Sequence, residues 1–323
     1  MSRLQVGGKH ARPLNISCSF LFMRRTRAII VASLCFNLLA AAGVGYLVHR
    51  RGDVRWLAAK AGRAKKQARH IDTVTPAKKS FFLMVKEEQR HPVELVSVEG
   101  CPAFLILPAD ASHEPRPWVW FAPTLLPAYP NQANAWLFER FLDAGIAVAG
   151  IDVGESYGSP EGVRKYSQFH EFVRKHYGFS SRPCLLAQSR GGLMLYNWAS
   201  RNPGQVKCIA GISPVCDLRS YPGLSDACAS FGMSVRDLEM NLSKYNPIDE
   251  LKPLAEARVP ILHLHGGQDA LVPNEANSGE LVTRYRQLGG RADLIIIPNE
   301  GHTDSGSFFR NEELVEWVLR QLK

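Results

Sequence analysis

The sequence lacks the patterns that mark zinc-binding, repetitive or disordered proteins. Its seven cysteines form no CxxC pair and no zinc-finger spacing, and no internal repeat or low-complexity tract occurs. A composition of 46% hydrophobic and 21% charged residues is typical of a folded globular chain. We therefore expect neither a metal site nor a cofactor. Cys216 and Cys228 could form a disulfide in an oxidising compartment, but their spacing alone does not decide this.

A basic excess is absent from most of the chain. Residues 1–80 contain 16 Lys and Arg but only two Asp and Glu, a net charge of +14, so the formal charge of +9 leaves −5 for the remainder. Nucleic-acid binding needs a basic stripe on the folded domain. The charge distribution therefore argues against a nucleic-acid partner.

One long uncharged run covers residues 28–48, between arginines on both sides. As a helix, 21 residues span about 30 Å, the thickness of the hydrocarbon core of a membrane. The run predicts a single-pass anchor in contact with membrane lipids, preceded by a tail of residues 1–27. A cleaved signal peptide is the alternative, because Ala40–Ala42 supplies small residues for processing.

A basic stalk or linker is expected at residues 49–85. Apolar residues in 54–69 recur at helical spacing among Lys and Arg, which fits either a helix on an anionic membrane surface or a solvated stalk. More Lys and Arg follow the apolar run than precede it, which favours the cytoplasm for the rest of the chain. The sequence leaves the side of the membrane open.

Short apolar runs alternate with amphipathic stretches over residues 86–323, which predicts one domain with a mostly parallel sheet flanked by helices. The expected strands are Ala103–Leu107, Trp118–Ala122, Ile146–Ile151, Pro183–Ala187, Val206–Ile212, Ile261–Leu264 and Leu294–Ile297. The expected helices are Asn131–Ala144, Glu161–Tyr177, Gly191–Arg201, Asn274–Leu288 and Glu312–Leu322. Residues 216–258 interrupt the alternation, and we expect them to form a small cap over the ligand-binding end of the sheet.

Ser189 stands where an apolar strand turns into a helix. A nucleophile at such a sharp turn needs small residues two positions before and after it, and Ala187 and Gly191 meet this need. The Arg190 N–H at the start of the helix could point at a developing oxyanion. Taken alone, the same pattern also describes an ordinary turn serine.

Two further residues give Ser189 its chemical context. Asp269 follows the strand at 261–264, and His302 follows the next strand, so nucleophile, acid and base stand in the order Ser, Asp, His beyond separate strands. Asp217 is an alternative acid, because it follows an earlier strand. Asp304 is less favoured, since it lies too close to His302 in the chain.

This constellation resembles the α/β-hydrolase superfamily, and most closely its esterase and prolyl-oligopeptidase-like members, over roughly residues 90–323. The resemblance implies that Ser189 attacks a carbonyl, that His302 transfers its proton, and that Asp269 orients the imidazole. It implies a hydrolase of a small ester, working through an acyl-enzyme. A small peptidase or amidase of the same fold is the alternative, and a non-catalytic binding protein with this fold is another.

The remaining candidates surround this constellation. Thr124 or Leu125 should supply the second oxyanion donor, because Pro123 has no N–H and the His-Gly common in relatives is missing. Glu155 and Tyr157 follow another strand end and are expected to line the substrate pocket. His263 and His265 would share one strand face, where packing is a better interpretation than a metal site, because no third ligand is evident.

Overall fold

The structure is a computed structural model that describes residues 91–109 and 114–323. The predicted tail, anchor and stalk all lie outside the described residues. Within the described ranges, no helix is both long enough and apolar enough to cross a membrane.

One eight-stranded sheet organises these residues, in the order β1-β2-β4-β3-β5-β6-β7-β8. The pairs β1–β2 and β2–β4 are antiparallel, and the five remaining pairs are parallel. The predicted mostly parallel sheet is therefore confirmed. The strands are β1 (Val93–Val98), β2 (Cys101–Ile106), β3 (Trp118–Ala122), β4 (Ala147–Ile151), β5 (Cys184–Gln188), β6 (Cys208–Ile212), β7 (Ile261–Gly266) and β8 (Ala292–Ile297).

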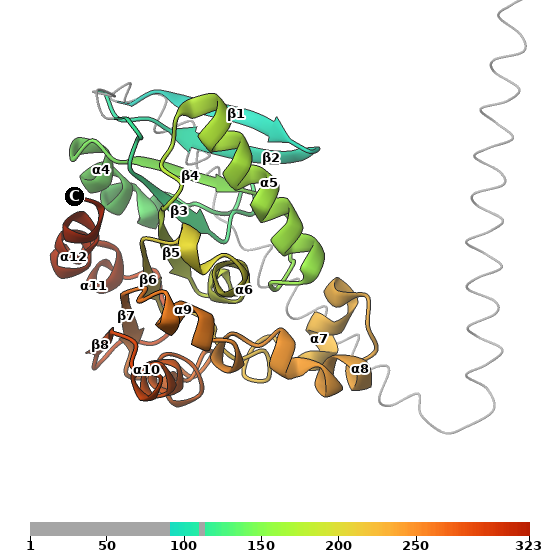
Figure 1. The fold of residues 1–323 in the computed structure, drawn as a ribbon. Helices are drawn as coiled ribbons and strands as arrows, with labels where there is room; N and C mark the ends of the chain where they lie inside the picture. Colours follow the sequence, from blue (N-terminus) through green and yellow to red (C-terminus); the bar gives the residue numbers. More distant parts are fainter. Residues whose placement is uncertain (1–90, 110–113) are drawn as a thin grey trace, which may run out of the picture. The chain divides into compact units, whose positions relative to one another are not determined.

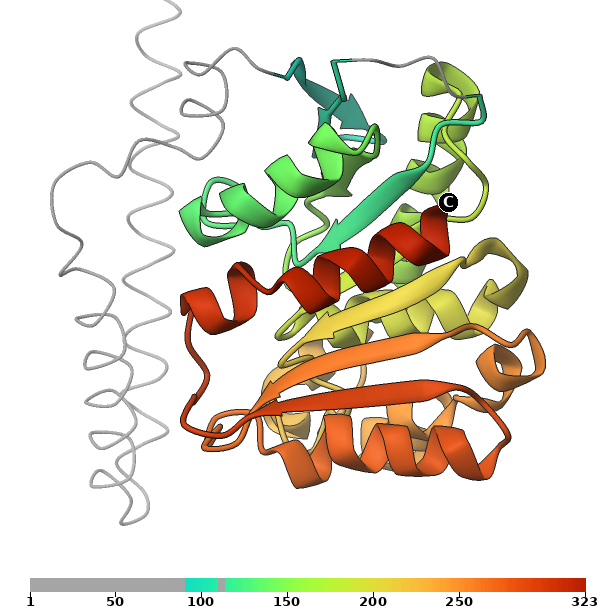
Figure 2. The same ribbon diagram turned by 90° about the vertical axis from the view of Figure 1, so that its left-hand side faces the viewer.

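Helices cover both faces of the sheet (Figure 1). One layer consists of α5 (Pro160–Tyr177), α6 (Gly191–Arg201), α9 (Lys252–Glu256) and α10 (Ser278–Gln287). The opposite layer consists of α4 (Ala135–Asp143), α11 (Gly306–Phe309) and α12 (Glu312–Leu322), and Figure 2 looks onto it, with α12 in dark red. Strands buried on both faces explain why the sequence shows continuous apolar runs.

Local sequence signals set the ends of the longest helix. Ser159 is the N-cap of α5 and accepts a hydrogen bond from the Gly162 N–H, and Pro160 occupies the first helical position. Gly178 ends the helix with a φ of 65°, a left-handed conformation that glycine adopts without steric cost. The predicted helix at 161–177 is correct to within one residue.

Strand β1 is absent from the sequence prediction. It lies at the edge of the sheet and pairs only with β2, so most of its residues are exposed or half-buried and it contains no apolar run. Leu95, for example, is 63% exposed. An edge strand of this kind gives a weak periodic signal.

Residues 216–258 form the predicted insertion between β6 and β7, which we call the cap segment. Its elements are α7 (Leu224–Ala227), η3 (Cys228–Phe231), α8 (Val235–Met240), η4 (Leu242–Lys244), η5 (Pro247–Asp249) and α9. Cys216 is buried and Cys228 half-buried, and both are free thiols, so the disulfide considered from the sequence is not formed.

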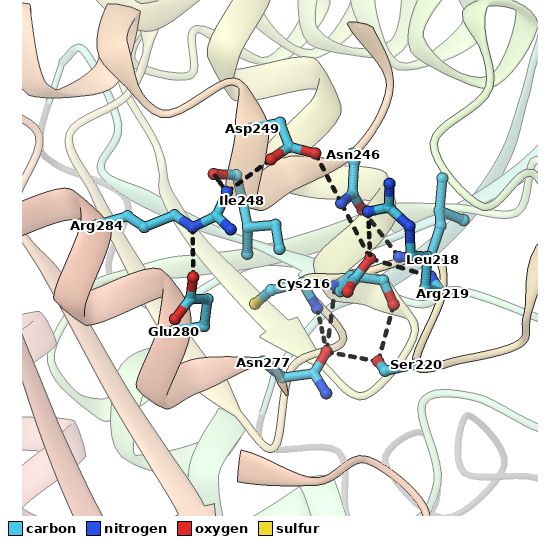
Figure 3. A network of polar contacts seen from close by, with 11 residues as sticks. Cys216, Leu218, Arg219, Ser220, Asn246, Ile248, Asp249, Asn277, Glu280 and Arg284 are labelled. Carbon is cyan, nitrogen blue, oxygen red and sulfur yellow. Dashed lines mark hydrogen bonds and ion pairs between the residues drawn. The ribbon is translucent and has the colours of Figure 1, made fainter. Parts of the chain in front are cut away.

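A polar network fastens the base of the cap segment to the start of α10 (Figure 3). The Asn277 side-chain oxygen accepts hydrogen bonds from the backbone N–H groups of Cys216 and Asp217 and from the Ser220 hydroxyl. Its amide donates to the Pro273 carbonyl at 2.9 Å. Because Asn277 is fully buried, these four bonds join the cap segment and the loop after β7 at one point.

Candidate active site

The backbone around Ser189 forms a sharp turn between β5 and α6. Ser189 has a φ of 49°, which is a strained conformation for a residue with a side chain. Its N–H donates to the Ile212 carbonyl at 3.0 Å, and its carbonyl accepts from Gly192 and Val215. Bonds from two neighbouring segments therefore hold the strained conformation in place.

Gly191 lets the helix approach the neighbouring strand closely. A Cβ built on Gly191 would lie 2.1 Å from the Ala122 carbonyl oxygen and 2.5 Å from the Pro123 nitrogen. Both contacts are too short for real atoms, so only glycine fits. The steric requirement inferred from the sequence motif is therefore present at this position.

Ser189, His302 and Asp269 form one hydrogen-bonded chain. The Ser189 Oγ lies 2.8 Å from His302 Nε2, and His302 Nδ1 lies 2.8 Å from Asp269 Oδ2. A carboxylate can only accept, so Nδ1 carries the proton and Nε2 is free to accept the serine hydroxyl proton. An imidazole in this tautomer can act as a general base toward the hydroxyl.

The Asp269 carboxylate is stabilised in its charged form. Burial by itself would raise the pKa of Asp269, but the hydrogen bonds from His302 and from the Val272 N–H outweigh burial and lower it. Leu271 N–H and Val272 N–H both donate to Oδ1, at 3.1 and 2.8 Å. Oδ2 is thereby left for His302.

A cavity of about 230 Å³ opens beside the Ser189 hydroxyl. Its lining combines hydroxyl, amide, carboxylate and aromatic groups with short apolar ones. The lining residues are Pro123, Tyr129, Gln188, Ser189, Arg190, Ile212, Ser213, His302, Thr303, Asp304 and Phe309. None of them belongs to the cap segment, so the expectation that this insertion covers the pocket is not met at the cavity itself.

The loop after β3 contains the two predicted N–H donors, Thr124 and Leu125. The Leu125 N–H donates to the Tyr129 carbonyl at 3.0 Å, so the prediction of Leu125 is wrong. Thr124 is 2% exposed and extends β3 through a bridge to Asp152, and it is not among the residues that line the cavity. The Thr124 N–H stays a prediction.

Tyr129 lines the cavity and is a second residue there that carries a hydrogen-bond donor. Its ring lies under the Arg190 guanidinium, 5.9 Å from the guanidinium carbon to the ring centroid. Burial, followed by the negative charge of Asp304, raises the pKa of Tyr129, although Arg190 opposes the shift. The phenol therefore stays protonated and can donate a hydrogen bond. Arg190 itself lines the cavity directly after Ser189, at the helix end where N–H groups have no intrahelical partner.

The two predicted pocket residues, Glu155 and Tyr157, are not among the residues that line the cavity. Glu155 accepts a hydrogen bond from the Arg190 guanidinium at 2.6 Å and does not line the cavity, and Tyr157 packs against the apolar cluster of the cap segment. Neither residue lines the cavity beside Ser189, so their role as pocket residues stays a prediction. The contact of Glu155 is an ion pair with Arg190.

Both alternative acids have other partners. Asp217 accepts hydrogen bonds from the Arg219 N–H and the Asn246 amide, within the network of the cap segment. Asp304 accepts from the side-chain amides of Asn131 and Gln188, at 3.0 and 3.4 Å, and forms part of the cavity wall. Asp269 is the acid that contacts His302.

His263 and His265 are packed in the interior, as the sequence interpretation favours. Both are fully buried in β7, and each ring nitrogen has a protein hydrogen-bond partner. In the described part of the chain, no group of three or more His, Cys, Asp or Glu residues is arranged to hold a metal ion.

Two residues of the site escape sequence reasoning. Tyr129 stands seven residues beyond the end of β3 between Ala128 and Pro130, and only the fold returns its ring to Ser189. Ser278 begins α10 and contacts both buried histidines. The one weak sign of this contact in the sequence is a small polar residue at the start of a helix whose other inward positions are apolar.

Comparison with known proteins agrees with this architecture. Residues 166–323 match the model of the prolyl oligopeptidase family. The chain is 29% identical over 119 residues to the "Putative carboxymethylenebutenolidase" of Salmonella typhimurium, covering 35% of this chain and 42% of that protein. It is 24% identical over 131 residues to the acylamino-acid-releasing enzyme of Arabidopsis thaliana, covering 38% and 17%.

The solved structure of an S-formylglutathione hydrolase from Agrobacterium tumefaciens superimposes with a TM-score of 0.56 at 16% identity, covering 72% of this chain and 95% of that one. The chain spans less than half the length of the curated relatives it matches. The order of the strands, the strained turn at Ser189 and these similarities all indicate the same fold. The chain therefore has the α/β-hydrolase fold, and over residues 166–323 it is similar to the prolyl oligopeptidase family.

Proposed function

We propose that the protein is a serine hydrolase that cleaves a small carboxylic ester through an acyl-enzyme. The observation that carries the proposal is the chain from the Ser189 hydroxyl through His302 to Asp269, with 2.8 Å at each step. In the first step His302 Nε2 takes the hydroxyl proton while Ser189 Oγ bonds to the carbonyl carbon. His302 then gives that proton to the leaving alcohol, and the acyl group stays on Ser189.

Water completes the cycle by the same groups in reverse order. His302 takes a proton from water, the resulting hydroxide adds to the acyl carbonyl, and Ser189 leaves with the proton returned by His302. Asp269 stays ionised throughout and stabilises the imidazolium, since hydrogen bonds hold its pKa below the usual range.

Two donors are placed to stabilise the oxyanion. The Arg190 N–H stands at the start of α6, where the helix dipole favours a negative charge. Tyr129, which lines the same cavity, would contribute its hydroxyl, and its raised pKa keeps the proton available. In our proposal Tyr129 takes the role that the sequence assigns to Thr124 or Leu125.

The size of the cavity favours a small acyl group. At about 230 Å³ it is below the roughly 300–1,000 Å³ typical of drug-sized ligands. Ile212 and Phe309 give part of its wall an apolar surface. A short acyl chain fits these dimensions better than a long fatty chain.

A small peptidase or amidase is the second candidate, and Asp304 is the observation that favours it. Its partners Asn131 and Gln188 are neutral amides, so these contacts leave its negative charge uncompensated at the cavity wall. A carboxylate there can hold the ammonium group of an aminoacyl substrate. The relative from Arabidopsis thaliana is named as an acylamino-acid-releasing enzyme.

Labelling with a fluorophosphonate probe tests the nucleophile. We expect the wild-type chain to label and Ser189→Ala to remain unlabelled. The same pair of proteins is assayed with p-nitrophenyl acetate, butyrate and octanoate and with alanine p-nitroanilide. Faster turnover of the short esters supports the esterase, and faster turnover of the anilide supports the peptidase. Equal labelling of both proteins, or of neither, would refute the proposed nucleophile.

The sequence also supports a membrane tether at residues 28–48, which lie outside the described residues. The proposal rests on an uncharged run of 21 residues closed by arginines. Carbonate extraction tests it, because an anchored chain stays in the membrane pellet, whereas a chain with a cleaved signal peptide is released. Protease accessibility in intact cells then reports the side on which the catalytic domain lies.

A further inference from the structure

A buried row of polar side chains runs from α6 to the loop that carries Asp269. The Tyr196 hydroxyl lies 2.7 Å from His263 Nε2, and His263 Nδ1 lies 2.9 Å from the Ser278 hydroxyl. The same hydroxyl lies 2.8 Å from His265 Nδ1, and His265 Nε2 lies 2.8 Å from the Val272 carbonyl oxygen. All five residues are at most 1% exposed.

The chemistry of the groups gives this row a single direction. A carbonyl only accepts, so His265 Nε2 carries the proton, and its unprotonated Nδ1 accepts from the Ser278 hydroxyl. With its one proton used, the Ser278 oxygen accepts from His263 Nδ1–H. His263 Nε2 then accepts from the Tyr196 hydroxyl. Every polar atom of the row is satisfied in one arrangement of protons.

The two histidines of the row are neutral. Burial, together with the neighbouring His265, lowers the pKa of His263 to about 3. Burial also lowers the pKa of His265, although the bond to Val272 and the charge of Asp269 oppose it. Protonating His265 at Nδ1 would leave the Ser278 hydroxyl proton without an acceptor, which is a further penalty in a dry interior.

The end of the row holds the peptide that orients Asp269. His265 binds the Val272 carbonyl, while the N–H of the same residue donates to Asp269 Oδ1 at 2.8 Å. Asn277 binds the next carbonyl, that of Pro273 (Asn277 is labelled in Figure 3). His265 Nε2 is 3.7 Å from Asp269 Oδ2, too far for a hydrogen bond, so it does not compete with His302 for that oxygen.

We propose that His265 is a positioning residue for the acid of the site: as a neutral donor whose ring is held at Nδ1 by Ser278, it binds the Val272 carbonyl through Nε2–H and thereby aims Asp269 at His302. This inference rests on the proposed function. It assigns a role to a histidine that touches neither the cavity nor His302. The row also links α6, the helix that begins beside Ser189, to the loop of Asp269, so nucleophile and acid share one rigid support.

The test compares His265→Leu with His170→Leu in the full chain. His170 is a matched control, because it is also a buried histidine that donates from Nε2 to a backbone carbonyl, that of Ser181 at 3.0 Å, but it lies on α5 away from the site. We expect His265→Leu to lower kcat for a short p-nitrophenyl ester about 10- to 100-fold with KM unchanged, because misplacing a catalytic group by about 1 Å costs about 100-fold. His170→Leu should keep kcat even if it unfolds more easily.

A conservative replacement adds a rescue test. His265→Gln retains an amide donor for the Val272 carbonyl, so it should recover part of the rate lost in His265→Leu. If His265→Leu does not fold, Ser278→Ala replaces it, since this variant removes a single oxygen and with it the hydrogen bond that holds the His265 ring at Nδ1. Wild-type kcat in both His265→Leu and Ser278→Ala would overturn the proposal, as would an equal loss in His170→Leu.

A proton NMR measurement separates this inference from the proposed function. The His302 Nδ1–H bound to Asp269 should give a low-field resonance, identified by its loss in His302→Gln. We expect the resonance to shift or vanish in His265→Leu and to persist in His170→Leu, whether or not the protein hydrolyses esters. If the wild type hydrolyses no ester but the resonance responds in this way, positioning stands and the proposed function fails. An unchanged resonance in His265→Leu overturns the positioning.

Discussion

Replacing Gly191 with alanine should damage the site more than any surface glycine change. The added methyl group would lie 2.1 Å from the Ala122 carbonyl oxygen and 2.5 Å from the Pro123 nitrogen. Real Cβ contacts essentially never fall below 3.0 Å, so the helix and the end of β3 must separate by about 1 Å. This separation would move the start of α6, and Ser189 with it, away from Pro123 in the cavity wall.

The magnitude follows from that displacement. Overpacking of a tight interior costs about 1–3 kcal/mol of stability, and a misplacement of about 1 Å lowers a catalysed rate about 100-fold. Alanine in an open helical position acts in the opposite direction, stabilising by up to about 1 kcal/mol relative to glycine. The sign of the stability change therefore separates a clash from a neutral substitution.

The assay measures urea unfolding and the rate of fluorophosphonate labelling, with Gly204→Ala as the control. Gly204 lies in the short 3-10 helix η2 (Pro203–Gln205), and no heavy atom stands within 4 Å of the methyl group that alanine would add there. We expect Gly191→Ala to lose both stability and labelling rate while the control keeps both. A Gly191→Ala protein with wild-type stability and labelling would refute the close approach on which the nucleophile's geometry depends.

Three other perturbations have defined outcomes. Tyr129→Phe should lower kcat about 10²- to 10³-fold with fluorophosphonate labelling retained though slowed, because one oxyanion donor is lost; an unchanged kcat would return the role to a backbone group. Asp269→Asn should lower kcat about 10⁴-fold in a stopped-flow or long end-point assay, and Asp217→Asn should not. The unfolding free energy should fall as pH drops from 7 toward 4. Burial lowers the pKa of His170 to about 4, so the unfolded state takes up protons below pH 6.5 that the folded state refuses. Urea titrations at several pH values give the unfolding free energy as a function of pH. Between pH 6 and 4 this free energy should change with pH by about 1.4 kcal/mol per unit less in His170→Gln than in the wild type, and an identical pH dependence would contradict this assignment.

Sequence reasoning succeeded where local signals and chain order coincide. β3, α6 and α12 begin and end where the apolar spacing predicts, because their apolar runs and flanking turns are local properties. Ser189, Asp269 and His302 meet because each follows a parallel strand, and such strands end at the same edge of a sheet. Their contact is therefore foreseeable from order alone.

Sequence reasoning failed where a contact depends on how a loop folds back. Whether the Leu125 N–H faces the cavity depends on the turn that gives it the Tyr129 carbonyl, and no local pattern encodes that pairing. The same folding brings the Tyr129 ring to the cavity. The partner of Glu155, Arg190, likewise became clear only from the structure.

The sequence by itself determined every strand of the sheet except the edge strand β1, the main flanking helices and the three residues that meet at Ser189, since hydrophobic periodicity and the order of the strands along the chain are local properties. It also confined the basic excess to residues 1–80. Only the tertiary structure decided that the Leu125 N–H pairs with Tyr129, how large the cavity is, and that His265 binds the peptide that contacts Asp269. These features depend on how the chain folds back on itself, where an ångström of backbone position decides whether a hydrogen bond exists.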